Sequence, residues 1–230
     1  MLTSNKSGSA PSKLASIKTW LTSRGLLLLG CLALTTLSFS QYRNVIMLLG
    51  CEAVERDFGG GSGGRPVPDA RCDGGFVAVA FHVQTGEYFN QAWLDCVPMR
   101  SDGMLGEERR TTARTGSAGG RDVQDAQCRP GKVLRGLKGR TGASIDEAIG
   151  VCSSLRELGD RGDQGDRRDR HDRYDDPGTE MTNPVTIPRP AGRPAEAQCP
   201  SGSVLVGFRS RGGEWMDHLS ILCSEVQRTY

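Results

Sequence analysis

Three short segments of this 230-residue chain place a polar side chain four positions after a glycine. The segments are Gly86 to Asn90, Gly142 to Asp146 and Gly213 to Asp217. An aromatic ring stands two positions before the polar residue in the first and third, at Tyr88 and Trp215. A carboxylate accepts strong hydrogen bonds from hydroxyl groups, and an aromatic ring offers an apolar face. Asp146 and Asp217 are therefore candidate ligands for the hydroxyls of a sugar, and Asn90 marks the same position without the charge.

Glycine-rich loops accompany these segments. They contain Gly63 and Gly64, Gly119 and Gly120, and Gly192. Because glycine has no Cβ, the backbone N–H groups of such loops can approach a ligand closely, so we expect each loop to contribute to a site. A plainer interpretation stays open. An Asp in a tight turn commonly bonds its own backbone, the loops can serve only as strand connections, and the aromatic rings can pack at the end of a sheet.

The sequence offers little for catalysis or for a metal centre. Its three histidines, His82, His171 and His218, are scattered along the chain, and no nucleophile can be placed beside His218. An Asp-rich stretch after residue 159 lacks the defined loop of a calcium site. We therefore expect no enzyme activity, no cofactor and no bound metal.

Residues 1–51 have the composition of an export leader. They carry basic residues and no acidic one, and an apolar stretch runs from Gly25 to Ser40. This pattern predicts a secreted or cell-envelope protein that meets a membrane only through its leader or a lipid. The sequence Leu48-Leu49-Gly50-Cys51 is similar to a bacterial lipobox, which makes Cys51 a lipidation candidate. Cleavage near Ser40 and a retained anchor are the alternatives.

Six of the eight cysteines form three pairs with one spacing. The pairs are Cys72 and Cys96, Cys128 and Cys152, and Cys199 and Cys223, each separated by 24 positions. In an exported chain, equal spacing predicts one disulfide within each repeat, and closing a loop of this length contributes about 3.5 kcal/mol. A structural zinc site is the rival interpretation, but the paired Cys-x-x-Cys or histidine spacing of such sites is missing.

Each cysteine pair encloses a unit with the pattern of a β-hairpin. Apolar residues alternate after the first cysteine, with Val77, Val79, Phe81 and Val83 in the first unit and Val204, Val206 and Phe208 in the third. Alternation with period two predicts a half-buried strand. A glycine turn and a second run follow, so we expect an antiparallel hairpin whose two cysteines face each other across its open end.

Three such units make residues 52–230 a single β domain, with repeats at about 59–112, 113–158 and 181–230. Between the second and third repeats, residues 159–180 are rich in Asp and Arg, and Asp recurs at every third position from 160 to 175. Such a segment buries too little apolar surface to fold, so it predicts a disordered insertion. Pro184, Pro188, Pro190 and Pro194 then predict an extended linker into the third repeat.

The composition agrees with an all-β protein that has many turns. Only 37% of the residues are hydrophobic, and the chain contains 31 glycines and 11 prolines. The core must therefore be modest, and long helices are not expected. The net charge of +2 comes from the basic leader, which leaves the domain acidic on balance. Nucleic-acid binding needs clustered positive charge and is therefore not expected.

Three units that each combine a Gly loop, a strand and a Gly-x-x-x-Asp segment resemble the β-prism I fold of jacalin-related lectins, in a griffithsin-like layout. The loop Gly59 to Gly64 together with Gly86 to Asn90, and the loop Gly116 to Gly120 together with Gly142 to Asp146, look like the family's pairing of motifs. The third loop is reduced to Arg189 to Gly192. The paired cysteines are closer to those of vitelline-membrane outer-layer proteins, which share the prism. The resemblance implies three four-stranded antiparallel sheets about a pseudo-threefold axis, with each repeat supplying about one sheet.

The same resemblance implies a function. It implies an exported, lectin-like protein that binds glycans or a glycosylated surface at up to three shallow sites, around Asn90, Asp146 and Asp217. With loops and segments paired in this way no repeat is complete, because the first lacks the acid, the second the aromatic ring and the third the full Gly loop. That incompleteness favours the alternative, a disulfide-stapled structural or cell-surface interaction protein that binds no sugar.

Overall fold

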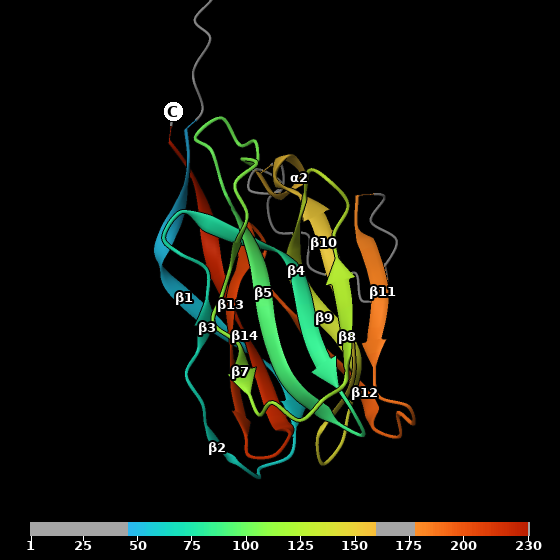
Figure 1. Ribbon diagram of the computed structural model, residues 1–230. Helices are drawn as coiled ribbons and strands as arrows, with labels where there is room; N and C mark the ends of the chain where they lie inside the picture. Colours follow the sequence, from blue (N-terminus) through green and yellow to red (C-terminus); the bar gives the residue numbers. More distant parts are fainter. Residues whose placement is uncertain (1–45, 160–177, 230) are drawn as a thin grey trace, which may run out of the picture. The chain divides into compact units, whose positions relative to one another are not determined.

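The computed structural model describes residues 46–159 and 178–229, and strands make up most of them (Figure 1). Residues 1–45 of the predicted leader and residues 160–177 of the predicted insertion lie outside the described residues. Within the described ranges the one helix is short, α2 (Leu155–Gly159), and no helix is long and apolar enough to cross a membrane. The all-β fold class is therefore confirmed.

The strands form three antiparallel sheets, each built around the hairpin of one repeat. The first sheet contains β4 (Phe76–Thr85) and β5 (Phe89–Pro98), flanked by β8 (Asp122–Gln127) and by the short strands β6 (Arg110–Thr111) and β7 (Thr115–Gly116). The second contains β9 (Lys132–Thr141) and β10 (Ile145–Ser154), flanked by β12 (Arg193–Gln198) and β11 (Glu180–Thr186). The third contains β13 (Ser203–Gly212) and β14 (Met216–Thr229), flanked by β1 (Ile46–Gly60), β2 (Arg65–Pro66) and β3 (Ala70–Arg71).

The flanking strands of each sheet come from the segment that leads into the next repeat. The third sheet takes its flanking strands from the start of the domain. There β1, which precedes the first repeat, pairs with β14 of the last repeat, from Ile46 opposite Thr229 to Gly60 opposite His218. A sheet therefore combines one repeat's hairpin with the following connection, which refines the expectation of one sheet per repeat. Residues 46–51 of the predicted leader lie in β1.

The linker predicted before the third repeat is instead part of a sheet. β11 and β12 pair with the two strands of the second hairpin, with Pro184 opposite Ile149 and Pro194 opposite Arg140. Both are outer strands, where a missing proline N–H leaves no partner unsatisfied. Pro184 and Pro194 therefore lie on sheet edges, and the segment that was predicted as an extended linker forms two strands of the second sheet.

One β-bulge recurs at the same place in all three hairpins. The strand register shifts at Val79, Arg135 and Val206, each seven positions after the first cysteine of its repeat. In each case the bulged carbonyl accepts a hydrogen bond, at 2.7 to 3.0 Å, from the N–H of a first cysteine in another repeat. Val79 and Arg135 accept from the next repeat along the chain, and Val206 accepts from Cys72 of the first repeat. The three repeats are thus equivalent in their detailed geometry as well as in their spacing.

The bulge also divides the residues that were expected to share one strand face. Phe81 and Val83 lie in the main core between the sheets, whereas Val77 and Val79 belong to a second buried cluster that includes Leu155 of α2. A bulge adds one residue and reverses the alternation beyond it. The predicted face of the first strand was therefore wrong, and most of β4 is buried rather than half-buried.

The three predicted disulfide pairings are confirmed. They join Cys72 to Cys96, Cys128 to Cys152 and Cys199 to Cys223, with Cα–Cα distances of 5.8, 5.8 and 5.5 Å. They do not close the open ends of the hairpins. Cys96 lies on β5, opposite Ala78, whereas Cys72 follows β3 along the third sheet and donates its N–H to Val206.

The other two disulfides follow the same plan. Cys128 follows β8 of the first sheet and bonds to β10 of the second, and Cys199 follows β12 of the second sheet and bonds to β14 of the third. A turn separates each first cysteine from its hairpin, so that cysteine stays on the preceding sheet. Each disulfide therefore joins two neighbouring sheets, and together the three connect every pair of sheets.

Candidate functional site

The turns that carry the three candidate polar residues have one shared geometry. Each is closed by a hydrogen bond from the glycine N–H to the carbonyl two residues later, at 2.9 to 3.0 Å. The bonds run from Gly86 to Tyr88, from Gly142 to Ser144 and from Gly213 to Trp215. The turns lie at the end of the hairpins away from the disulfides, at the lower end of the molecule in Figure 1.

The Gly loops meet these turns in a different combination from the one that the resemblance implies. A Cβ on Gly64 would lie 2.4 Å from Oδ2 of Asp217, and a Cβ on Gly119 would lie 2.9 Å from Nδ2 of Asn90. The N–H of Gly192 donates to Oδ2 of Asp146 at 2.7 Å. Each loop thus faces the turn of the preceding repeat, because the flanking strands that hold the loop belong to that repeat's sheet.

The site at Asp217 gains most from this arrangement. Gly63 and Gly64, from the fullest of the Gly loops, lie against its carboxylate. Trp215 is exposed, and its Nε1–H donates to Oδ1 of Asp217 at 3.0 Å. The acid and the aromatic ring of the third repeat therefore meet the full Gly loop that was expected to serve the first repeat.

The site at Asn90 is engaged internally. The Asn90 side-chain amide donates to the carbonyl of Glu214 at 3.1 Å, and its Oδ1 is shielded from solvent beside Gly86. Gly119 and Gly120 close the other side of this turn. The ring of Tyr88 is exposed at this turn, so the position offers an apolar surface, while Oδ1 of Asn90 is shielded.

The site at Asp146 is closed. Asp146 is buried, with 7% of its surface exposed. Its Oδ1 accepts the hydroxyl of Ser144 at 3.2 Å, and its Oδ2 accepts the backbone N–H groups of Gly192 and Ala191 at 2.7 and 3.3 Å. Both carboxylate oxygens therefore have protein partners, which is the structural role that was left open for this residue.

Two residues that support the loops were not identified from the sequence. Arg211 donates to the carbonyls of Gly63 and Gly64 at 3.3 and 3.2 Å, and Gln84 donates to the carbonyl of Gly120 at 2.7 Å. Both stand twelve positions after the first cysteine of their repeats, and this common position could have identified them. The two residue types differ, so a comparison of the repeats by residue identity does not reveal the match.

The two histidines among the described residues contact carboxylate side chains, and His218 also lies opposite Gly60 of the first Gly loop. His82 lies between Asp95 and Asp125, and its Nε2 is 3.1 Å from Oδ2 of Asp95. His218 Nε2 lies 3.1 Å from Oδ1 of Asp57. Within residues 46–159 and 178–229, no cluster of three or more His, Cys, Asp and Glu side chains is arranged to hold a metal ion.

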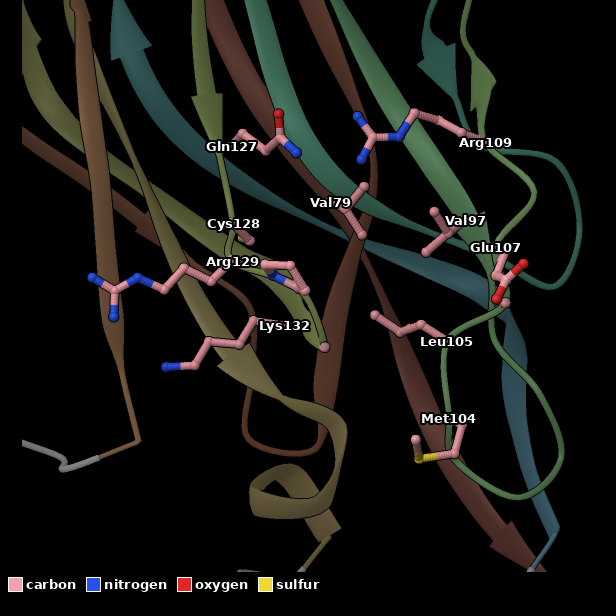
Figure 2. A pocket seen from close by; sticks show the side chains of 13 residues that line it. Val79, Val97, Met104, Leu105, Glu107, Arg109, Gln127, Cys128, Arg129 and Lys132 are labelled. Carbon is pink, nitrogen blue, oxygen red and sulfur yellow. The ribbon is translucent and has the colours of Figure 1, made fainter.

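A cavity of about 460 Å³ lies near the disulfide end of the first hairpin (Figure 2). Val79, Val97 and Leu105 form apolar parts of its wall, and charged groups stand at its rim. The rim cations have carboxylate partners, since Arg109 pairs with Asp95 and Lys132 and Arg129 share Glu180. No residue predicted to bind a ligand lines this cavity.

Comparison with known proteins finds similarity in solved structures. The sequence matches no protein-family model and no curated protein. The chain is similar to a mannose binding jacalin related lectin from Ananas comosus, at 16% identity and a TM-score of 0.47 over 74% of this chain and 96% of that one. It is also similar to the lectin frutapin from Artocarpus incisa, at 12% identity and a TM-score of 0.49 over 76% and 99%. These neighbours are jacalin-related lectins, the family that the repeat pattern resembles.

Proposed function

We propose that this protein is a non-enzymatic, lectin-like protein that binds carbohydrate at the end where its turns and Gly loops meet. The observation that carries the proposal is the grouping of Asp217, Trp215 and the Gly63–Gly64 loop. A carboxylate can accept hydrogen bonds from two sugar hydroxyls, and an exposed indole can pack against the apolar CH face of a sugar ring. A Gly loop has no side chains that would block the approach of the sugar.

The three equivalent turns contribute unequally to this function. We propose Asp217 as the acceptor of hydrogen bonds from sugar hydroxyls, and Tyr88 and Trp215 as the apolar contacts. Asp146 has a structural role, because its buried carboxylate bonds to the third Gly loop. The buried position of Asp146 supports the alternative function for that turn alone, a structural role without ligand. We therefore expect one polar sugar site instead of three.

A glycan array tests this proposal with two matched variants. We expect Asp217→Ala to remove binding, because the hydroxyl acceptor is lost. Asp146→Ala removes an equivalent carboxylate from a closed site, so we expect it to keep the array profile while lowering the melting temperature. Binding by the Asp217→Ala protein at the wild-type level would reject the site, and an array with no bound glycan for the wild type would favour the structural alternative.

We also propose that the chain is exported, on the composition of residues 1–51. A lipid on Cys51 is one form of this proposal, and simple cleavage or a retained anchor are the others. Mass spectrometry of the mature amino terminus tests them, because each form has a different mass. A cytoplasmic protein that begins at Met1 would contradict export.

A further inference from the structure

The cavity of about 460 Å³ beside the first hairpin is lined by residues of the second buried cluster of the domain (Figure 2). Val79 and Val97 belong to that cluster, and Leu105 packs against it. Met104 also lines the cavity, although 49% of its surface is exposed. A concave surface of this volume with an apolar wall is typical of sites that bind small molecules.

The cavity lies at the bulge that the three hairpins share. Val79 is the bulged residue of the first hairpin, and Cys128, which donates to its carbonyl, lines the same cavity. The equivalent residues Val206 and Cys72 line a cavity of about 310 Å³ in the third sheet. The bulged residue of the second hairpin is Arg135. A recess beside the bulge therefore recurs in the fold, and the residues around it determine what it can bind.

The recess of the first sheet is the larger of these two cavities. Val97 lines it, whereas the equivalent position in the third sheet is Ser224, whose hydroxyl donates to the carbonyl of Gly50 at 2.7 Å. The connection between β5 and β6 adds Met104 and Leu105 to the wall of the first cavity. An alkyl chain in this cavity therefore contacts apolar side chains from three segments of the chain.

The charged side chains around the cavity point in different directions. In Figure 2 the polar ends of Arg109 and Gln127 lie at the same end of the cavity and point toward each other. Arg129 and Lys132 extend away from this end and share the carboxylate of Glu180. Arg109 is therefore the cation that faces the cavity.

Arg109 retains donors for a ligand. Among the described residues, its guanidinium forms one hydrogen bond, from Nη1 to Oδ2 of Asp95 at 3.1 Å. A guanidinium has several N–H donors in a planar fork, so Arg109 can bind a second carboxylate while it keeps Asp95. Such hydrogen bonds are charge-assisted and stronger than those between neutral groups. Glu107, the acid that lines the cavity, lies beyond Val97 from this guanidinium in the view of Figure 2.

We propose that this cavity binds a small amphipathic carboxylate, such as a medium-chain fatty acid. The carboxylate of the ligand binds to Arg109 and to the amide of Gln127, and its alkyl chain lies against Val79, Val97 and Leu105. The cavity lies near the disulfide end of the first hairpin, away from the turns that carry the proposed sugar contacts. The inference therefore goes beyond carbohydrate binding and does not depend on it.

Calorimetric titration of the protein with hexanoate, octanoate and 1-octanol, all below micellar concentrations, tests this site. We expect one octanoate to bind per protein, about sixteenfold more tightly than hexanoate, because each buried CH₂ group contributes about fourfold. Octanol has the same chain without the charge. We expect it to bind about tenfold more weakly than octanoate, because the charge-assisted hydrogen bonds to Arg109 are lost.

Three variants locate the ligand in the cavity. Arg109→Gln should reduce the affinity for octanoate to that for octanol. Arg129→Gln is the matched control, because it removes a nearby cation that extends away from the cavity, and it should keep the wild-type affinity. Val79→Arg introduces the residue type that Arg135 provides at the second bulge, and it should block octanoate and octanol alike. Melting temperatures show whether each variant is folded.

The wild type alone can overturn the proposal. Absence of saturable octanoate binding would reject the site, and equal affinities for octanoate and octanol would reject a carboxylate as the ligand group. Neither measurement needs a variant, so both decide the question even if Val79→Arg is unstable. Octanoate binding at wild-type strength by folded Arg109→Gln would also overturn the proposal. The glycan array is a separate measurement, so failure of this site leaves the proposed function unaffected.

Discussion

Gly64 has two separate reasons to be glycine. Its φ of 64° lies in the left-handed region, which side chains disfavour. A Cβ there would also lie 2.4 Å from Oδ2 of Asp217 and 2.6 Å from the Cα of Gly212. The first reason concerns backbone strain, and the second concerns the position of the proposed sugar acceptor.

Gly64→Ala should therefore damage binding and stability together. We expect a loss of about 1–3 kcal/mol in the free energy of unfolding and a marked loss of glycan affinity, because the carboxylate of Asp217 must move. Gly74→Ala is the matched control, since a Cβ at Gly74 meets no atom within 4 Å. Thermal unfolding and glycan titration measure both effects, and wild-type binding by folded Gly64→Ala would contradict the loop assignment.

The candidate residues at this end could be predicted from sequence, but their roles could not. The Gly-x-x-x-Asp/Asn spacing identified Asn90, Asp146 and Asp217 because it is local. The closure of Asp146 depends on backbone N–H groups of Ala191 and Gly192, which are far away along the chain. The completeness of the Asp217 site depends on a loop that is far away along the chain, which the pairing of β1 with β14 and of β2 with β13 brings near.

At the scale of elements, polar and charged side chains from β4, β5, β6 and the residue before β6 form a cluster in the first sheet. Asp95 on β5 accepts a hydrogen bond from Thr111 at 2.8 Å and one from Arg109 at 3.1 Å, and it lies beside His82. Burial raises the pKa of Asp95, but the Thr111 hydrogen bond and the interactions with His82 and Arg109 together hold this pKa below that of an ordinary aspartate. The folded state therefore favours the charged carboxylate.

Asp95→Asn should lower stability at neutral pH and flatten its acid dependence. A group whose pKa is lower in the folded state contributes stability that is present above its unfolded pKa, about 4, and that is lost as pH falls through the folded value. We expect a loss of about 1–3 kcal/mol at pH 7, with the two proteins converging in acid. Urea unfolding between about pH 2 and pH 7 measures this difference. An equal destabilisation at every pH would mean that Asp95 acts by packing alone.

The hairpins themselves could be predicted from cysteine spacing and apolar alternation, but the bulge inside them could not. The bulged residues are Val79, Arg135 and Val206, so no residue type marks the position. What fixes it is the carbonyl that each bulge presents to a cysteine N–H of another repeat. Short-range periodicity does not contain that long-range contact, which is why the predicted strand faces failed beyond it.

At the scale of the whole molecule, the disulfides hold sheets to one another. Cys72 and Cys96 connect the third sheet to the first, and the other two pairs connect the remaining neighbours. The cysteine spacing predicted the pairings, since it is equal in all three repeats. It could not predict which sheets they connect, because the first cysteine of each repeat directly follows a strand that belongs to the preceding sheet.

Removal of one disulfide should weaken the whole domain and not a single hairpin. We expect the double variant Cys72→Ala, Cys96→Ala to lose about 2–4 kcal/mol in the free energy of unfolding, with one cooperative transition that shifts as a unit. Differential scanning calorimetry measures the shift, and the corresponding variant of Cys199 and Cys223 serves as comparison. A separate early transition, with the remainder of the domain unchanged, would contradict the role of the disulfide in joining sheets.

The three disulfides should also keep the domain in one piece after proteolytic cleavage. Each of the three turns lies between the two cysteines of its own repeat, which are 24 positions apart, and the turn residues Glu87 and Glu214 are exposed. After a backbone cut at such a turn, the disulfide of that repeat still joins the two fragments covalently. Its two cysteines lie on neighbouring sheets. A nicked molecule would therefore migrate as one species on a gel and separate only when reductant is added.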